Sequence, residues 1–442
     1  MVFKAYDIRG IYGKEIDERF AYSLGKCLGE KFKDKDVLVG NDVRFGSKNL
    51  LPYFILGLSE NANVHYAGLI STPLLYFGTK GKYDLGVIIT ASHNPPEYTG
   101  FKMCDKKAIP LSPKEEIKPI FKFYDIDRSV KEEAEKLDLD NYKVDVIEEY
   151  KKFFMKKFDK DFDIKIAVDF ANGATTVAEK EILKELFDDI VLINDYPDGS
   201  FPAHLPDTLK EECLKDIKKA VFENKCDLGL IFDGDGDRLG MVDEREETLR
   251  GDIITAIIAK EILKENKGVK IIYDLRCSKI VPEIIEKFGG VAIKSRVGHY
   301  FIKKLMHEID GYFAGELSNH FYFKEIGYFE SPLLALYYIL KIMDEEDKKL
   351  SELNREFNKY YHSGEINFKV SDQKKVLEKI KEIYKNCKIE ELDGVSVYCK
   401  DFWFNLRPSN TEPLIRLNLE AEKEEILKEK VEEIKRLIES MK

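Results

Sequence analysis

The chain has few cysteines, the residues that form disulfides in small secreted proteins and bind structural zinc: there are seven in 442 residues. It also has a single tryptophan. The cysteine number is odd and no two are closer than twelve residues, which argues against a disulfide framework or a cysteine-based zinc site and favours reduced thiols. The apolar runs are too short to span a bilayer, and the start MVFKAYDIRG lacks the features of a secretory signal. These absences predict a cytoplasmic protein without a membrane partner.

Positively charged residues are fewer than negatively charged ones: the chain has 71 Lys and Arg and 82 Asp and Glu, which gives a net charge of -11. Nucleic-acid binders normally carry a basic face, so no nucleic-acid partner is expected, and any bound phosphate must meet a local cationic pocket. The length exceeds what one hydrophobic core usually supports, which predicts about three domains. The sequence carries no signal for an oligomeric state.

Three segments repeat one pattern, a short apolar run near an aspartate, then a helical stretch, then a second apolar run. The aspartates are Asp42, Asp169 and Asp274, and their uneven spacing favours divergent α/β domains over a solenoid. The predicted strand, helix and strand ranges are 37–42, 48–60 and 64–68, then 164–169, 176–187 and 190–195, then 270–274, 280–288 and 291–296.

Boundaries between domains are predicted where the sequence becomes polar. A charge-dense connector covers 125–145, a polar turn covers 245–251, and 361–364 precedes a smaller α+β region. The predicted domains are 1–141, 142–247, 248–360 and 361–442, the first three α/β and the last α+β.

The run Asp233-Gly-Asp235-Gly-Asp237-Arg238 sets three carboxylates two residues apart with glycines between them. The glycines allow a backbone that turns all three oxygens to one point. Hard oxygen ligands favour Mg²⁺ or Ca²⁺ over zinc. Arg238 would repel the metal, so we expect it to bind an anion that shares the site, phosphate being the obvious one.

A calcium-binding EF-hand is the alternative for this run, because Asp233, Asp235, Asp237 and Glu244 occupy its positions 1, 3, 5 and 12. Position 6 needs glycine but is Arg238, and residues 226–232 before the loop have the apolar pattern of a strand rather than a helix. The mismatch disfavours calcium signalling.

Ser92 lies in Thr90-Ala-Ser-His-Asn-Pro-Pro96, directly after the apolar strand predicted at 85–89. Ligands of open α/β sheets bind at the carboxyl ends of strands. Taken alone, a serine before two prolines is more often an ordinary turn residue.

Four motifs together resemble those of the α-D-phosphohexomutase family, and the resemblance spans nearly the whole chain. TASHNP from Thr90 resembles its phosphoserine loop, DGDGDR from Asp233 its metal loop, GELS from Gly315 its sugar-recognition loop, and RPSNTEP from Arg407 its phosphate-binding loop. The resemblance implies three related α/β domains with mixed sheets and a smaller C-terminal α+β domain around a central cleft.

The resemblance also implies the chemistry. Ser92 would carry a phosphoryl group, and Ser92, Asp233, Asp235 and Asp237 would hold Mg²⁺. The substrate would be a sugar phosphate, a hexose 1-phosphate of glucose or mannose, which becomes a hexose 1,6-bisphosphate intermediate and then the 6-phosphate. The same machinery acting on glucosamine or pentose phosphates is an alternative, as is a sugar-phosphate-binding protein without turnover.

Further site residues follow from the same resemblance. Lys102, His299 and Arg9 match catalytic residues of the family, and Arg276 stands where relatives carry a lysine. Asn319 replaces a common glycine in the sugar loop. Residues expected to bind the substrate are Arg238, Glu316, Ser318, His320, Arg407, Ser409, Asn410 and Thr411.

Overall fold

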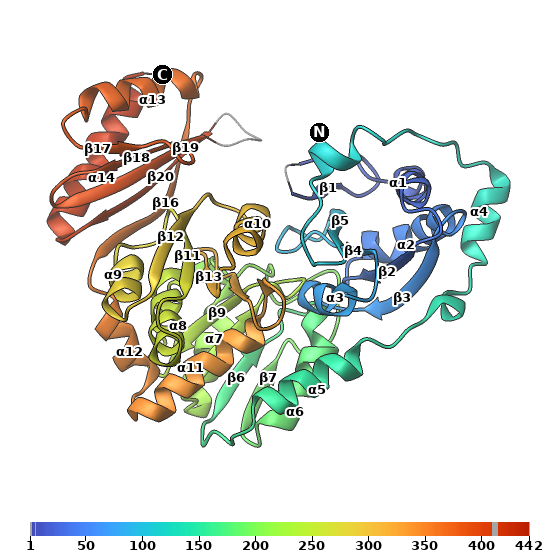
Figure 1. The fold of residues 1–442 in the computed structure, drawn as a ribbon, viewed down its shortest axis with the longest axis horizontal. Helices are drawn as coiled ribbons and strands as arrows, with labels where there is room; N and C mark the ends of the chain where they lie inside the picture. The colour runs from blue at the N-terminus through green and yellow to red at the C-terminus, as the bar shows by residue number, and fades with distance from the viewer. Residues whose placement is uncertain (1, 5, 409–413, 442) are drawn as a thin grey trace.

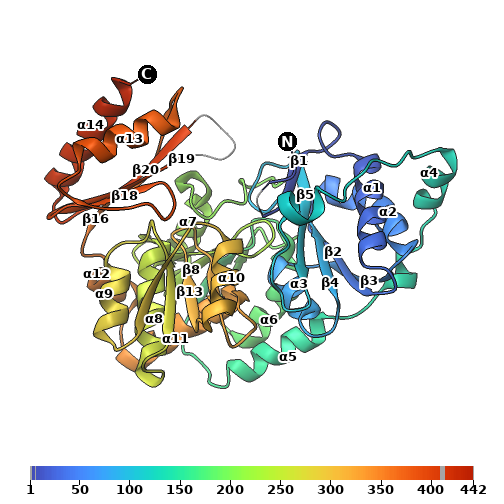
Figure 2. The ribbon, with the colours of Figure 1, turned by 45° about the horizontal axis from the view of Figure 1, so that its top comes forward.

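The computed structural model describes residues 2–4, 6–408 and 414–441. These residues form four five-stranded sheets, each built from one continuous part of the chain. The sheet nearest the N-terminus and the sheet nearest the C-terminus lie at opposite ends of the molecule, with the other two between them (Figures 1 and 2).

The first three sheets have helices packed against them. The first contains β1 (Ile8–Ile11), β2 (Asp36–Asn41), β3 (Asn63–Leu69), β4 (Leu85–Ile89) and β5 (Tyr98–Asp105), with α1 (Glu18–Lys31), α2 (Phe45–Ser59) and α3 (Thr72–Thr79). The second contains β6 (Ile166–Asp169), β7 (Ile190–Ile193), β8 (Leu228–Phe232), β9 (Leu239–Asp243) and β10 (Thr248–Leu249), with α5 (Ile147–Lys157), α6 (Ala178–Leu186) and α7 (Lys215–Asn224). The third contains β11 (Lys270–Asp274), β12 (Val291–Ser295), β13 (Phe313–Gly315), β14 (Phe321–Phe323) and β15 (Phe329–Glu330), with α8 (Gly251–Glu265), α9 (Ile280–Lys287), α10 (His299–Ile309), α11 (Pro332–Glu346) and α12 (Leu350–Phe357).

These three sheets share one topology. In each, one central strand pairs in parallel with the next two strands of the chain, and an antiparallel strand and an antiparallel edge strand complete the sheet. The edge strand is β1 in the first sheet, where it precedes the other strands in the chain, and β10 and β15 in the others, where it comes last. The central strands are β2, β6 and β11, and the predicted aspartates follow or end them. The three predicted strand–helix–strand units are therefore confirmed, and so are the mixed sheets. The connector at 125–145 holds the short helix α4 (Arg128–Glu135), as expected for a surface segment.

The C-terminal sheet is wholly antiparallel and has its own hydrophobic core. It contains β16 (Tyr361–Lys369), β17 (Lys388–Glu390), β18 (Val395–Tyr398), β19 (Phe402–Pro408) and β20 (Leu414–Ala421), with α13 (Gln373–Ile383) and α14 (Glu424–Glu439). The largest core cluster instead draws on residues from Leu38 to Phe357, so it joins the first three sheets. The predicted α+β character of this region is confirmed.

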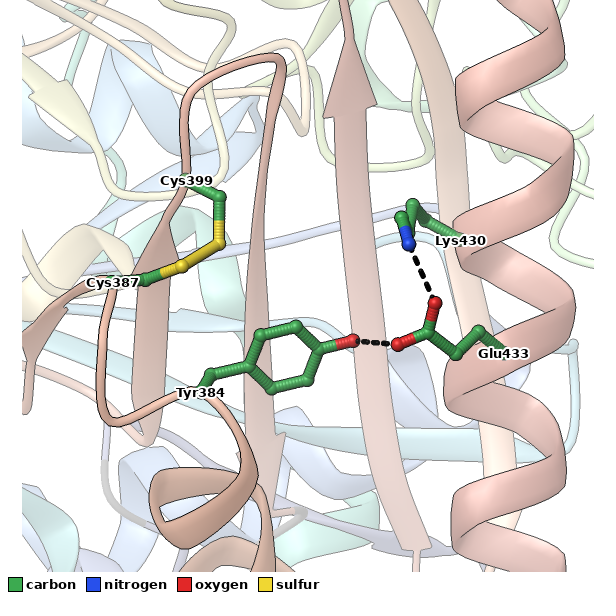
Figure 3. Close-up of a disulfide and its surroundings, with 5 residues drawn as sticks. All are labelled: Tyr384, Cys387, Cys399, Lys430 and Glu433. Carbon is green, nitrogen blue, oxygen red and sulfur yellow. Dashed lines mark hydrogen bonds and ion pairs between the residues drawn. A yellow bond between two sulfur atoms is a disulfide. The ribbon is translucent and has the colours of Figure 1, made fainter.

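The expectation that every thiol is reduced is wrong for one pair. Cys387, just after α13, and Cys399, just after β18, form a disulfide (Figure 3). Their Cα atoms are 5.1 Å apart because Cys387 directly precedes β17 and Cys399 directly follows β18, and these two strands pair antiparallel with Lys388 opposite Tyr398. The sequence spacing alone does not reveal this pairing. The other five cysteines are free and buried. In the described part of the chain, no helix has the length and hydropathy that crossing a membrane requires.

Candidate functional site

A cavity of about 710 Å³ is lined by residues from all four sheet units. Most of the predicted site residues lie on its wall. Those that line it are Arg9, Ser92, Lys102, Asp237, Arg238, His299, Glu316, Ser318, His320 and Arg407. Asp233 and Asp235 are fully buried directly behind this wall. Ser409, Asn410 and Thr411 fall outside the described residues.

The Ser92 loop and the acidic run meet at the cavity, although 141 residues separate them. Ser92 follows β4, Asp233 follows β8, and Ser92 Oγ donates to Asp233 Oδ2 over 2.8 Å. Gly234 allows this approach, because a Cβ there would lie 2.5 Å from the carbonyl oxygen of Ser92. The strand predicted before the acidic run is present, which removes the EF-hand alternative.

The three aspartates have the donor set of a metal site. One oxygen from each of Asp233, Asp235 and Asp237 lies within 4.8 Å of the others. Within the described residues, Oδ1 of Asp235 is buried without a hydrogen-bond partner, and Oδ1 of Asp237 has an ion-pair contact with Nε2 of His320 at 3.3 Å. Burial and the neighbouring carboxylates raise the pKa of Asp233 to about 8. A divalent cation would satisfy the free oxygen of Asp235 and relieve this repulsion, so the residues fit a metal such as Mg²⁺.

Lys102 on β5 contacts the same acidic group. Its Nζ lies 2.6 Å from Asp235 Oδ2 and 2.5 Å from Asp237 Oδ2. Burial works against the ammonium charge, but the three carboxylates raise the pKa of Lys102 above its ordinary value. The Lys102 side chain therefore offsets part of the negative charge of the triad.

The sugar-loop residues form a connected group on the cavity wall. Glu316 accepts a hydrogen bond from Tyr322 Oη at 2.8 Å, and its Oε2 lies 3.1 Å from Nδ1 of His320. Ser318 Oγ lies 3.1 Å from the same nitrogen. Asn319 adopts φ of 66°, a left-handed conformation that glycine adopts freely and that asparagine tolerates better than most other residues.

Arg238 reaches the cavity from the second sheet unit and His299 from the third. The backbone N–H of Arg238 donates to Asp233 Oδ1 at 3.2 Å, and its Nε lies 3.4 Å from Nε2 of His320. His299 is the first residue of α10, and its Nδ1 lies 3.7 Å from Oε1 of the buried Glu330. Arg9 on β1 donates to Asn94 Oδ1 at 2.7 Å, which links it to the Ser92 loop.

Three arginines gather where the C-terminal sheet meets the cavity. Arg276, Arg407 and Arg416 line the wall, and each has an ion-pair contact with Glu365 on β16, at 3.9, 3.6 and 3.0 Å. Nε of Arg407 and Nε of Arg416 are buried and have no hydrogen-bond partner among the residues that the structure describes. Such donors are suited to an anion.

Arg416 and Glu365 were not predicted from the sequence, whereas Arg407 was. Arg407 and Arg416 are direct cross-strand partners of β19 and β20. The sequence signal that could have identified Arg416 is its position: two residues equally far from the middle of a predicted hairpin, here Arg407 and Arg416, lie opposite each other. Glu365 had no comparable signal.

Comparison with known proteins matches the chain to four consecutive family models. They are described as the phosphoglucomutase/phosphomannomutase α/β/α domains I, II and III, at residues 1–127, 142–247 and 250–360, and the C-terminal domain, at 365–437.

Similar full-length proteins carry related names. A phosphomannomutase of Methanocaldococcus jannaschii is 78% identical over 99% of this chain and 97% of its own length. A phosphomannomutase of Vibrio cholerae is 35% identical over 99% and 98%. The crystal structure of a phosphoglucomutase/phosphomannomutase family protein from Burkholderia thailandensis has a TM-score of 0.85 at 27% identity, covering 100% of this chain and 97% of that one. The chain belongs to the phosphoglucomutase/phosphomannomutase family.

Proposed function

We propose that the protein is a phosphohexomutase that interconverts the 1-phosphate and 6-phosphate of mannose, glucose or both. The observation that carries this proposal is the hydrogen bond from Ser92 Oγ to Asp233 at the wall of a cavity rich in arginine. Membership of the family and the name of the M. jannaschii relative support the reaction class. We propose that this cavity is the predicted central cleft. We also propose that the four domains surround it and have the predicted boundaries.

In the proposed reaction, Ser92 begins as a phosphoserine. The P–Oγ bond breaks as a P–O6 bond forms to hexose 1-phosphate; a base on the cavity wall takes the proton of the sugar hydroxyl, and an acid on the same wall protonates the departing Ser92 Oγ. The resulting 1,6-bisphosphate turns over, returns its C1 phosphoryl group to Ser92 and leaves as hexose 6-phosphate. Lys102, His299 and Arg9 are the groups we assign to proton transfer and charge stabilisation.

A magnesium ion, held by Asp233, Asp235, Asp237 and the phosphorylated Ser92, would supply neutralising charge to the transferring group. Glu316 and Ser318 would accept from and donate to sugar hydroxyls, with His320 fixed between them. Arg238 would bind the transferring phosphoryl group. Arg407, together with Ser409, Asn410 and Thr411 of the same loop, would hold the phosphate that does not transfer.

Intact mass and turnover test the proposal together. The wild-type chain should carry the mass of one phosphoryl group after incubation with hexose 1,6-bisphosphate, and Ser92→Ala should carry none and lose turnover. Ser129→Ala, which removes an exposed hydroxyl on α4, is the matched control and should behave as wild type. An active Ser92→Ala variant would reject the mechanism.

Substrate preference needs a separate comparison. Glucose and mannose differ only at C2, and the assigned sugar contacts address other hydroxyls. Rates with the 1-phosphates of glucose, mannose, glucosamine and ribose would rank the substrates. Faster turnover of glucosamine or ribose phosphate would favour the alternative substrates, and binding without isomerisation would favour a binding protein. The cytoplasmic location stays a prediction.

A further inference from the structure

Arg44, which precedes α2, is fully buried behind the Ser92 loop and does not line the cavity. An arginine side chain offers five N–H donors in a planar fork. Here each has an acceptor. The acceptors are the carbonyl oxygens of Ser92 (2.6 Å), Asn94 (2.6 Å), Pro95 (2.7 Å) and Tyr98 (3.1 Å), and Asp42 Oδ2 (3.1 Å).

The guanidinium group of Arg44 is in turn fixed by Asp42 and by Phe201. Asp42 pairs with Nε of Arg44, accepts its backbone N–H at 3.0 Å and accepts Ser47 Oγ at 2.6 Å. The ring of Phe201, from the second sheet unit, covers the guanidinium at 4.8 Å. Gly199 permits this packing, because a Cβ there would lie 2.4 Å from the carbonyl oxygen of Val43. Arg44 is therefore fixed in one orientation beneath the loop.

The loop needs such support because Ser92 adopts φ of 51°. A left-handed conformation is unfavourable for a residue other than glycine and persists only where the surroundings enforce it. Within the loop, the N–H of Ser92 donates to Thr90 Oγ1 at 3.0 Å and the N–H of Asn94 to the carbonyl of Ala91 at 3.1 Å. These bonds satisfy N–H groups of the loop, whereas Arg44, which does not line the cavity, satisfies the carbonyl groups of Ser92, Asn94 and Pro95.

We propose that Arg44 is a positioning residue for phosphoryl transfer, which holds the Ser92 loop so that Oγ faces the acidic triad. The inference rests on the proposed function. Lysine at this position keeps the charge but offers three donors from one atom, so it cannot span four carbonyl groups in a fixed plane. The role therefore depends on the shape of the side chain as well as its charge.

Arg44→Lys is the first test, with the exposed Arg19→Lys of the same domain as its matched control, since Arg19 also bonds a carbonyl and a carboxylate. We expect kcat for hexose 1-phosphate to fall about 100-fold with little change in KM, because a shift of about 1 Å in a reacting group has such an effect. Amide hydrogen exchange at residues 92–98 should accelerate, while exchange in the C-terminal sheet stays unchanged.

Chemical rescue covers the case in which the lysine variant folds poorly. Arg44→Ala should regain turnover with added methylguanidinium and not with methylammonium at the same concentration. Wild-type kcat and loop exchange in Arg44→Lys would overturn the proposal, as would equal rescue by the two cations. If the wild-type protein fails to isomerise any hexose phosphate, the proposed function is wrong, and the exchange comparison still decides whether Arg44 holds the loop.

Discussion

Removing the Cys387–Cys399 disulfide should destabilise the C-terminal domain selectively. The bond closes a segment with a sequence separation of 12 and joins the residue before β17 to the β18–β19 turn. In the chain-entropy treatment, a cross-link over about 13 residues stabilises the folded state by about 3 kcal/mol. The neighbouring link from Tyr384 Oη to Glu433, at 2.7 Å, and the pair Lys430–Glu433 remain when the disulfide is removed (Figure 3).

Hydrogen exchange of amides in β18 and β19 is the suitable assay, because this domain has a core of its own and can open separately. In Cys387→Ser/Cys399→Ser, these amides should exchange roughly 100-fold faster, the factor that corresponds to about 3 kcal/mol. Wild-type protein under dithiothreitol should behave likewise once the bond is reduced, and the double variant should not respond to the reductant.

The matched control is Cys213→Ala/Cys226→Ala, which removes two buried, unbonded cysteines of similar spacing from the second sheet unit. It should leave exchange in β18 and β19 at the wild-type rate. If the disulfide variant exchanges within a factor of two of wild type, the loop-closure argument is refuted.

Three further changes have defined outcomes. Glu179 accepts a hydrogen bond from Ser71, and its burial raises its pKa to about 7. Because the folded state must then lose a buried proton that the unfolded state loses near pH 4.5, the free energy of unfolding of the wild type should fall by about 3 kcal/mol as pH rises from about 4.5 to 7. In urea unfolding at pH 5 and 8, Glu179→Gln should lack that loss. Gly236→Ala places a Cβ 2.3 Å from Thr175 Cγ2 at φ of 72°, and should lower the free energy of unfolding by about 2 kcal/mol or more, with an unchanged urea midpoint as the contrary result. Asp235→Asn should weaken Mg²⁺ binding at least about tenfold in calorimetry, since it removes one of three anionic ligands, and equal affinity would contradict the assigned site.

The repeated aspartates and the acidic loop were predictable because local residue types determine them. Apolar runs of strand length ending near Asp42, Asp169 and Asp274 identified three α/β units, and alternating Asp and Gly identified the oxygen-ligand cluster. These patterns depend only on neighbours in the chain.

The features that escaped prediction depend on residues distant in sequence. Arg44 bonds backbone carbonyls about 50 residues away, and any residue type can supply a carbonyl, so no pattern indicates its role. The disulfide depends on how β17 and β18 fold back, and β17 itself is a three-residue strand too short for periodicity to reveal. Arg416 reaches the cavity only through the register of β19 with β20.

The lining of the cavity has a consequence for any solution in which the protein is studied. Among its described lining residues, seven Lys and Arg face four Asp and Glu, although the whole chain has a net charge of -11. Small multivalent anions will concentrate there. Sulfate, citrate or inorganic phosphate from a buffer should therefore act as competitive inhibitors, and apparent KM values will depend on the choice of buffer and on ionic strength.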